Sequence, residues 1–210
     1  MVTSELFEVS NGVTEVLIDR LESPKAIALI AHPHPLLGGN ANHKVPFTMM
    51  RAAIALGVSV YRPNFRGVGK SSGQYDGGVL ETQDIIDLTS LLREREGRVP
   101  FILMGFSFGA FIAARAEQAL AQASLSCDDV ILCGLPDGEV PGKRHYATPV
   151  VAEACLIHGE LDESAPLSQA LRWAERSNAS VRVVPGADHF FTGRLGVLSA
   201  LISERIKSKI

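Results

Sequence analysis

Apolar residues along the chain fall into short runs that alternate with longer segments in which they recur every three or four positions. Short runs are typical of buried strands, and the longer spacing is typical of amphipathic helices. The predicted strands cover residues 26–31, 58–62, 101–104, 129–133, 150–157 and 181–184. The predicted helices cover residues 45–56, 80–95, a segment starting at 110, 167–176 and 194–206. This alternation predicts an α/β fold over residues 1–210, a single domain with a mostly parallel central sheet flanked by helices.

Two further segments complete the pattern. Residues 6–9 and 13–18 are apolar-rich and are separated by Ser10-Asn11-Gly12, which predicts a hairpin. Residues 134–149 are rich in proline and glycine, which predicts a loop. This loop is too short, and too often interrupted by proline, to form a helical lid.

The stretch 100–115 contains Gly105-Phe106-Ser107-Phe108-Gly109 between a strand-like run and a helix-like segment. This is the G-x-S-x-G pattern in a strand–turn–helix context, where a sharp turn exposes the central serine. The glycines are required because both positions lie close to neighbouring backbone. Ser107 is therefore a candidate nucleophile, and the alternative is a serine that caps an ordinary helix.

A serine nucleophile needs a base within hydrogen-bond reach and a third group that orients the base. In open α/β sheets such groups follow the carboxyl ends of strands. Asp162 and His189 each follow a predicted strand, and the chain order Ser107, Asp162, His189 is that of one hydrolase fold. Glu160 and Glu163 compete with Asp162 for the role of the acid.

The pair His32-x-His34 invites a comparison with metal sites. A metal-binding continuation would supply an Asp-His pair, but Pro35-Leu36-Leu37 follows instead, and His43 is too isolated to complete a site. We therefore predict no metal and no cofactor.

Composition narrows the class of function. The chain has 210 residues, of which 46% are hydrophobic and 20% are charged, as in soluble globular proteins. A formal net charge of −3 without a basic cluster argues against nucleic acid and membranes as partners. Neither a signal peptide nor a membrane span is expected. Cys127, Cys133 and Cys155 lack metal-type spacing, so we expect reduced thiols and a cytoplasmic location.

Taken together, the motifs resemble those of the α/β-hydrolase superfamily, and specifically the small, lidless bacterial serine hydrolases related to dienelactone hydrolase. The resemblance covers residues 26–191 and rests on His32-Pro33-His34-Pro35 with Gly38-Gly39, Arg66-Gly67-x-Gly69-x-Ser71, Gly105-x-Ser107-x-Gly109, His158-Gly159-x-x-Asp162 and Asp188-His189-Phe190-Phe191. It implies an α/β-hydrolase fold without a lid domain and a triad of Ser107, His189 and Asp162. Dienelactone hydrolase has cysteine as its nucleophile, so Ser107 favours ester hydrolysis over lactone hydrolysis.

The same resemblance implies an oxyanion hole made of the Phe108 N–H and a second N–H from the loop after residues 26–31. The two prolines of that loop have no N–H to give. His34, Leu36 and Leu37 remain, and the resemblance favours His34, with Leu36 next. Candidates for a substrate pocket are Leu36, Phe106, Phe190 and Phe191.

We therefore expect a serine hydrolase that cleaves carboxylic esters of small molecules through an acyl-enzyme intermediate. A thioesterase or a small-peptide hydrolase would use the same triad. A hypothesis of another class is a catalytically silent binding module on the same fold. Because no helical lid is expected, the site should be an open groove unless a second subunit covers it.

Overall fold

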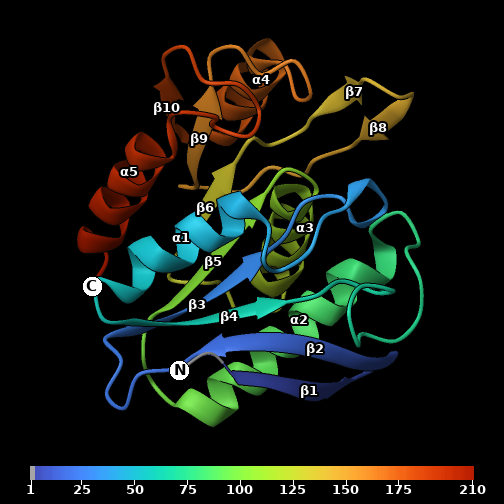
Figure 1. The fold of residues 1–210 in the computed structure, drawn as a ribbon, viewed down its shortest axis with the longest axis vertical. Coiled ribbons are helices and arrows are strands. Elements are labelled where there is room, and N and C mark those ends of the chain that lie inside the picture. Colours follow the sequence, from blue (N-terminus) through green and yellow to red (C-terminus); the bar gives the residue numbers. More distant parts are fainter. Residues whose placement is uncertain (1–2) are drawn as a thin grey trace.

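A sheet of eight strands forms the centre of the computed structural model, which describes residues 3–210 (Figure 1). Its strands follow the order β1-β2-β4-β3-β5-β6-β9-β10. Their bounds are β1 Thr3–Val9, β2 Gly12–Asp19, β3 Ala26–Ala31, β4 Val58–Pro63, β5 Phe101–Phe106, β6 Asp129–Cys133, β9 Cys155–Gly159 and β10 Ser180–Val184. The strands from β4 to β10 pair in parallel, whereas β1 and β2 form an antiparallel hairpin that extends the sheet beyond β4.

Five helices cover the two faces of this sheet (Figure 1). They are α1 Lys44–Ile54, α2 Val79–Glu96, α3 Phe108–Gln122, α4 Leu167–Ser177 and α5 Leu195–Lys207. Helices α2, α3 and α4 contribute to one buried apolar cluster, and α1 and α5 contribute to the other. Successive residues of β3 serve the two clusters in turn, because side chains alternate between the faces of a strand. Ile27 and Leu29 join the first cluster, and Ala28 and Ile30 join the second.

The segment predicted as a plain loop holds a second, two-stranded sheet. Strands β7 Gly138–Val140 and β8 Arg144–Tyr146 pair antiparallel across Pro141-Gly142-Lys143 and project away from the large sheet (Figure 1). Gly142 and Lys143 have φ values of 85° and 56°, which is the left-handed backbone that a tight hairpin turn requires. The proline and glycine of this segment therefore shape a hairpin turn rather than a structureless loop.

The predicted strand 150–157 begins later than expected, at Cys155. Glu153 lies just before it with a φ of 59°, a conformation that no strand accommodates. Val151 is nevertheless buried in the first apolar cluster, which explains why its segment has the hydrophobic pattern of a strand. Over residues 3–210, no helix combines the length and the apolar character needed to cross a bilayer.

Candidate active site

Ser107 lies at the turn between β5 and α3, at the carboxyl end of the parallel strands. Its φ of 57° and ψ of −123° are strained for a residue with a side chain, at a cost of about 1–3 kcal/mol. The two flanking glycines make this turn possible. A Cβ at Gly105 would collide with the carbonyl of Gly109, and one at Gly109 would collide with the carbonyl of Ala31. The spacing of the motif is thus fixed by close backbone contact.

The three residues expected to act together are joined by hydrogen bonds. Nε2 of His189 lies 2.9 Å from Oγ of Ser107, and its Nδ1 lies 2.7 Å from Oδ2 of Asp162. The other oxygen of Asp162 accepts the backbone N–H groups of Ser164 at 2.9 Å and Ala165 at 2.7 Å. Asp162 and His189 are both buried, with exposures of 5% and 7%. Burial and these bonds hold both side chains in fixed orientations.

The competing carboxylates lie elsewhere. Glu160 is exposed and accepts the backbone N–H of Gly186 at 2.8 Å, and Glu163 is exposed as well. Asp188 accepts the backbone N–H of Thr192 at 2.8 Å on the surface. Of the four acids near the two loops, Asp162 alone bonds His189 among the described residues.

His158 is a further contact of Asp162, and the sequence analysis assigns its side chain no role beyond its place in the motif. Its fully buried Nε2 lies 2.7 Å from the carbonyl of Ala165 and 3.4 Å from Oδ2 of Asp162. Both neighbours are acceptors, so Nε2 carries the proton. Burial lowers the pKa of His158, which keeps the ring a neutral donor beside the carboxylate. The spacing His158-x-x-x-Asp162 is the sequence signal of this contact.

A cavity of about 90 Å³ opens beside Ser107 and His189. Its remaining lining residues are Pro33, His34, Leu37, Gly39, His43, Pro136, Val140, Arg144, Tyr146, Ser164 and Phe190. The hairpin β7–β8 supplies Val140, Arg144 and Tyr146 to its wall, so the segment predicted as a plain loop contributes to the site. No local pattern in the sequence indicates that these three residues meet Ser107, because the hairpin fold brings them there.

Three of the four predicted pocket residues do not line this cavity. Leu36 points outward and is 70% exposed. Phe106 is fully buried, with its ring centroid 5.0 Å from that of His189, and Phe191 is fully buried in the second apolar cluster. Phe190 lies in the wall as expected. Residues that are adjacent in a strand or turn point to opposite sides. Phe106 and Phe191 therefore point away from the cavity that their neighbours Ser107 and Phe190 line.

The two N–H groups favoured for an oxyanion hole belong to Phe108, which follows Ser107 in the chain, and to His34, which lines the same cavity as Ser107. Phe108 begins α3, where backbone N–H groups have no partner within the helix. Within residues 3–210, no acceptor binds the N–H of Phe108 or of His34. His34 lines the cavity, and its ring packs against the rings of Tyr75 and Phe108 at centroid distances of 4.7 and 5.1 Å. Leu36 does not line the cavity, and the N–H of Leu37 donates to the carbonyl of His34 at 3.0 Å, which leaves His34 as the best placed of the three loop candidates.

His32 is unable to serve as a metal ligand because both ring nitrogens already have partners. Nε2 accepts the backbone N–H of Phe65 at 2.9 Å, and Nδ1 lies 2.6 Å from the carbonyl of Pro33. Nδ1 must therefore carry the proton, and the neutral ring joins the loops that follow β3 and β4. No group of three potential ligands suited to a metal occurs in the described part of the chain.

Burial lowers the pKa of His32 to about 3, far below its unfolded value of about 6.5. A lowered pKa means that the folded state favours the neutral ring. The resulting stability is complete above pH 6.5 and is lost as the pH falls toward 3. We expect the difference in unfolding free energy between wild type and His32→Gln to shrink by about 2–3 kcal/mol between pH 7 and 4.5. Urea unfolding at the two pH values measures this difference.

The stability of the wild type alone would not isolate the effect of His32, because Glu81 changes the unfolding free energy in the opposite direction as the pH falls. Burial and the neighbouring Asp76 raise the pKa of Glu81 to about 7, so its contribution improves as the pH falls. His145 is exposed on β8 and provides the matched control. His145→Gln should keep a constant difference from wild type at both pH values. An equally constant difference for His32→Gln would contradict the argument.

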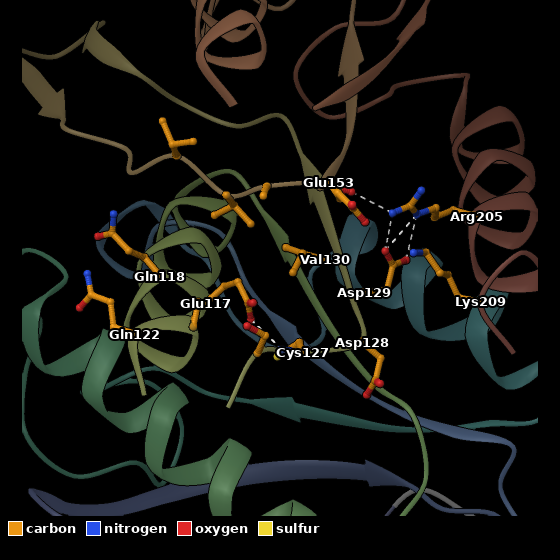
Figure 2. Close-up of a pocket in the computed structure, with 15 residues that line it drawn as sticks. Glu117, Gln118, Gln122, Cys127, Asp128, Asp129, Val130, Glu153, Arg205 and Lys209 are labelled. Carbon is orange, nitrogen blue, oxygen red and sulfur yellow. Dashed lines mark hydrogen bonds and ion pairs between the residues drawn. The ribbon is translucent and has the colours of Figure 1, made fainter. Parts of the chain in front are cut away.

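A larger cavity, of about 560 Å³, lies at the opposite, amino end of β6 (Figure 2). Arg205 binds Asp129 there at 2.6 Å, and Glu117 accepts the backbone N–H of Cys127 at 3.0 Å. Burial, followed by the charge of Glu117, raises the pKa of the Cys127 thiol, so this cysteine is not an activated nucleophile. This cavity therefore supplies no activated thiol.

Comparison with known proteins agrees with this architecture. The model of the alpha/beta hydrolase family matches residues 29–154. An uncharacterized protein of Rickettsia prowazekii is 40% identical, over 94% of this chain and 86% of that protein. An alpha-beta serine hydrolase homologue from Coxiella burnetii is 32% identical, over 97% of this chain and 96% of the other, with a TM-score of 0.84. A lidless serine hydrolase from Xanthomonas campestris is 26% identical, over 99% and 94%, also with a TM-score of 0.84.

The chain therefore belongs to the alpha/beta hydrolase family, and its fold, which is that of the alpha/beta serine hydrolases, supports a hydrolase activity. This confirms the resemblance inferred from the motifs and the expected fold. A dienelactone hydrolase of Anabaena variabilis, at 16% identity over 100% of this chain and 98% of that one with a TM-score of 0.78, shares the fold.

Proposed function

We propose that the protein hydrolyses carboxylic esters of small molecules, with Ser107 as nucleophile, His189 as general base and Asp162 as the group that orients the base. The continuous hydrogen bonding from Ser107 through His189 to Asp162 carries this proposal. A serine hydroxyl is a weak nucleophile, and a neutral imidazole at 2.9 Å can accept its proton as it attacks.

In the proposed reaction, Ser107 attacks the ester carbonyl while Nε2 of His189 takes its proton. The N–H groups of Phe108 and His34 stabilise the oxyanion of the tetrahedral intermediate, and the N-terminus of α3 adds a favourable dipole. His189 then returns the proton to the departing alcohol, which leaves an acyl-enzyme. Water activated by His189 hydrolyses this intermediate and restores Ser107.

The dimensions of the cavity support short substrates. A cavity of about 90 Å³ beside Ser107 leaves little room for the methylenes of a long acyl chain, each of which would add about 0.8 kcal/mol if buried. We expect p-nitrophenyl esters with acyl chains of roughly two to six carbons to be hydrolysed fastest, without activation by micelles. A chain-length series with and without detergent measures both. An optimum at laurate or longer would contradict this expectation.

A fluorophosphonate probe tests the catalytic role directly. Labelling that mass mapping places on Ser107, together with turnover of p-nitrophenyl butyrate, is the expected result. Labelling without ester turnover, but with turnover of acyl thioesters or small peptides, would move the activity to those substrates. A folded protein that is neither labelled nor active would indicate a silent binding module.

The free cysteines support a reducing, cytoplasmic setting for this activity. Cys133 and Cys155 are buried and Cys127 is partly buried, and none forms a disulfide in the described residues. The proposed partner is a small-molecule ester, and the proposed chemistry requires no cofactor.

A further inference from the structure

Arg144 lies on β8 and lines the same cavity as Ser107. Its Nε and Nη2 donate to the carbonyl of Pro141 at 3.2 and 2.9 Å, which holds the guanidinium within the hairpin. These bonds occupy one edge of the planar group. Within residues 3–210 the guanidinium makes one further contact, with the hydroxyl of Tyr146, which also lines the cavity, so the edge formed by Nη1 and Nη2 keeps N–H groups that a ligand can bind.

The charge of Arg144 has no acidic partner in the cavity. None of the thirteen lining residues is Asp or Glu. Among residues 3–210, no carboxylate lies within ion-pair distance of Arg144, whereas Arg176, which also reaches the segment after β6, binds Asp137 at 2.6 Å. The cavity beside the nucleophile therefore carries one fixed positive charge and no carboxylate in its wall.

This charge acts on the wall of the cavity. Burial lowers the pKa of His34, and the positive charge of Arg144 lowers it further. It also opposes the effect of burial, which raises the pKa of Tyr146. Both rings line the cavity, so the guanidinium lies close enough to influence groups that a substrate would touch.

From this arrangement we propose that the preferred substrates are esters that carry a carboxylate, and that Arg144 binds this carboxylate while Ser107 attacks the ester carbonyl. The inference rests on the proposed ester hydrolysis and names its substrate class. A carboxylate matches the free edge of the guanidinium in shape and its single charge in magnitude, and two parallel N–H···O bonds give a strong, oriented contact. Arg144 is thus a specificity-determining residue rather than a member of the triad.

Two ethyl esters of nearly equal size test the proposal. Monoethyl glutarate carries a carboxylate, and the ethyl ester of glutaramic acid carries a neutral amide in its place. Ethanol release gives kcat/KM for each, and the measured quantity is their ratio. Because hydrogen bonds to charged groups are strong, we expect the wild type to favour the acid by about 10- to 100-fold, mainly through a lower KM.

Variants of Arg144 locate the source of this preference. Arg144→Gln should bring the ratio to about 1, and Arg144→Lys should retain part of the preference because it keeps the charge. Arg98→Gln, which removes an exposed charge before β5, is the matched control and should leave the ratio at its wild-type value. Circular dichroism shows whether each variant is folded.

The outcomes separate this inference from the function on which it rests. Hydrolysis of both esters at equal rates by the wild type would overturn the role of Arg144 and leave ester hydrolysis standing. A preference that persists in Arg144→Gln would assign it to another residue and overturn the inference equally. If the wild type hydrolysed none of the three substrates, the two ethyl esters and p-nitrophenyl butyrate, the proposed function itself would be overturned.

Discussion

Replacing Ser107 with alanine should lower kcat/KM for p-nitrophenyl butyrate by a factor of about 10⁴ or more, because the hydroxyl is the proposed attacking group and, among residues 3–210, no other nucleophile bonds His189. The fold should stay intact. Alanine removes one oxygen at a position whose strained φ of 57° is held by the surrounding turn and its two glycines. Steady-state kinetics and thermal unfolding measure the two effects separately.

Ser90 provides a control for this substitution. It is exposed on α2 and its hydroxyl bonds only the carbonyl of Ile86, so Ser90→Ala should keep wild-type kinetics. The fluorophosphonate label should disappear in Ser107→Ala and persist in Ser90→Ala. If Ser107→Ala kept a tenth of the activity, Ser107 would not be the nucleophile.

The turn that carries Ser107 was predictable from the sequence because its determinants are local. A buried strand leads into the turn, glycines occupy the two positions where a Cβ would collide with backbone, and a helix follows. The convergence of Asp162 and His189 was predictable for a different reason. Each follows a strand of a parallel sheet, and the carboxyl ends of such strands share one edge. The structure places all three residues at that edge, with His189 within hydrogen-bond distance of both Ser107 and Asp162.

The walls of the cavity were less predictable because they depend on the side to which each residue points. Phe106 and Phe108 flank Ser107 in sequence, but they pack into apolar clusters on opposite faces of the sheet. Phe190 lines the cavity, while the next residue, Phe191, is fully buried in the second apolar cluster. The presence of aromatic residues next to a motif does not predict which of them line the cavity and which are buried in the core.

The β7–β8 hairpin illustrates the limit of composition as a guide. Proline and glycine in residues 134–149 excluded a helical lid, and the structure contains none there. The same residues form the turn that carries Arg144 and Tyr146 to the cavity. The composition of this segment thus predicted that no helical lid forms. The residues that it brings to the cavity depend instead on the pairing of β7 with β8.

Asp162→Asn should lower kcat by a factor on the order of 10⁴ although it preserves the shape of the side chain. Oδ1 accepts two backbone N–H groups, from Ser164 and Ala165, so the oxygen of asparagine must remain there. Its amide nitrogen would then face Nδ1 of His189, which would have to accept a hydrogen bond. The proton of His189 would move to Nε2, where it blocks transfer from Ser107. Steady-state kinetics with p-nitrophenyl butyrate measures the loss.

The opposite orientation of the asparagine amide is disfavoured because its nitrogen would meet the N–H groups of Ser164 and Ala165 and leave both unpaired. Glu160→Gln and Glu163→Gln are the matched controls, since each removes one negative charge from the same exposed loop without touching His189. Both should stay within a few-fold of wild type. A loss in Glu160→Gln or Glu163→Gln as large as that in Asp162→Asn would show that charge in this loop, rather than the tautomer of His189, limits the reaction. A small loss in all three would remove Asp162 from the proposed mechanism.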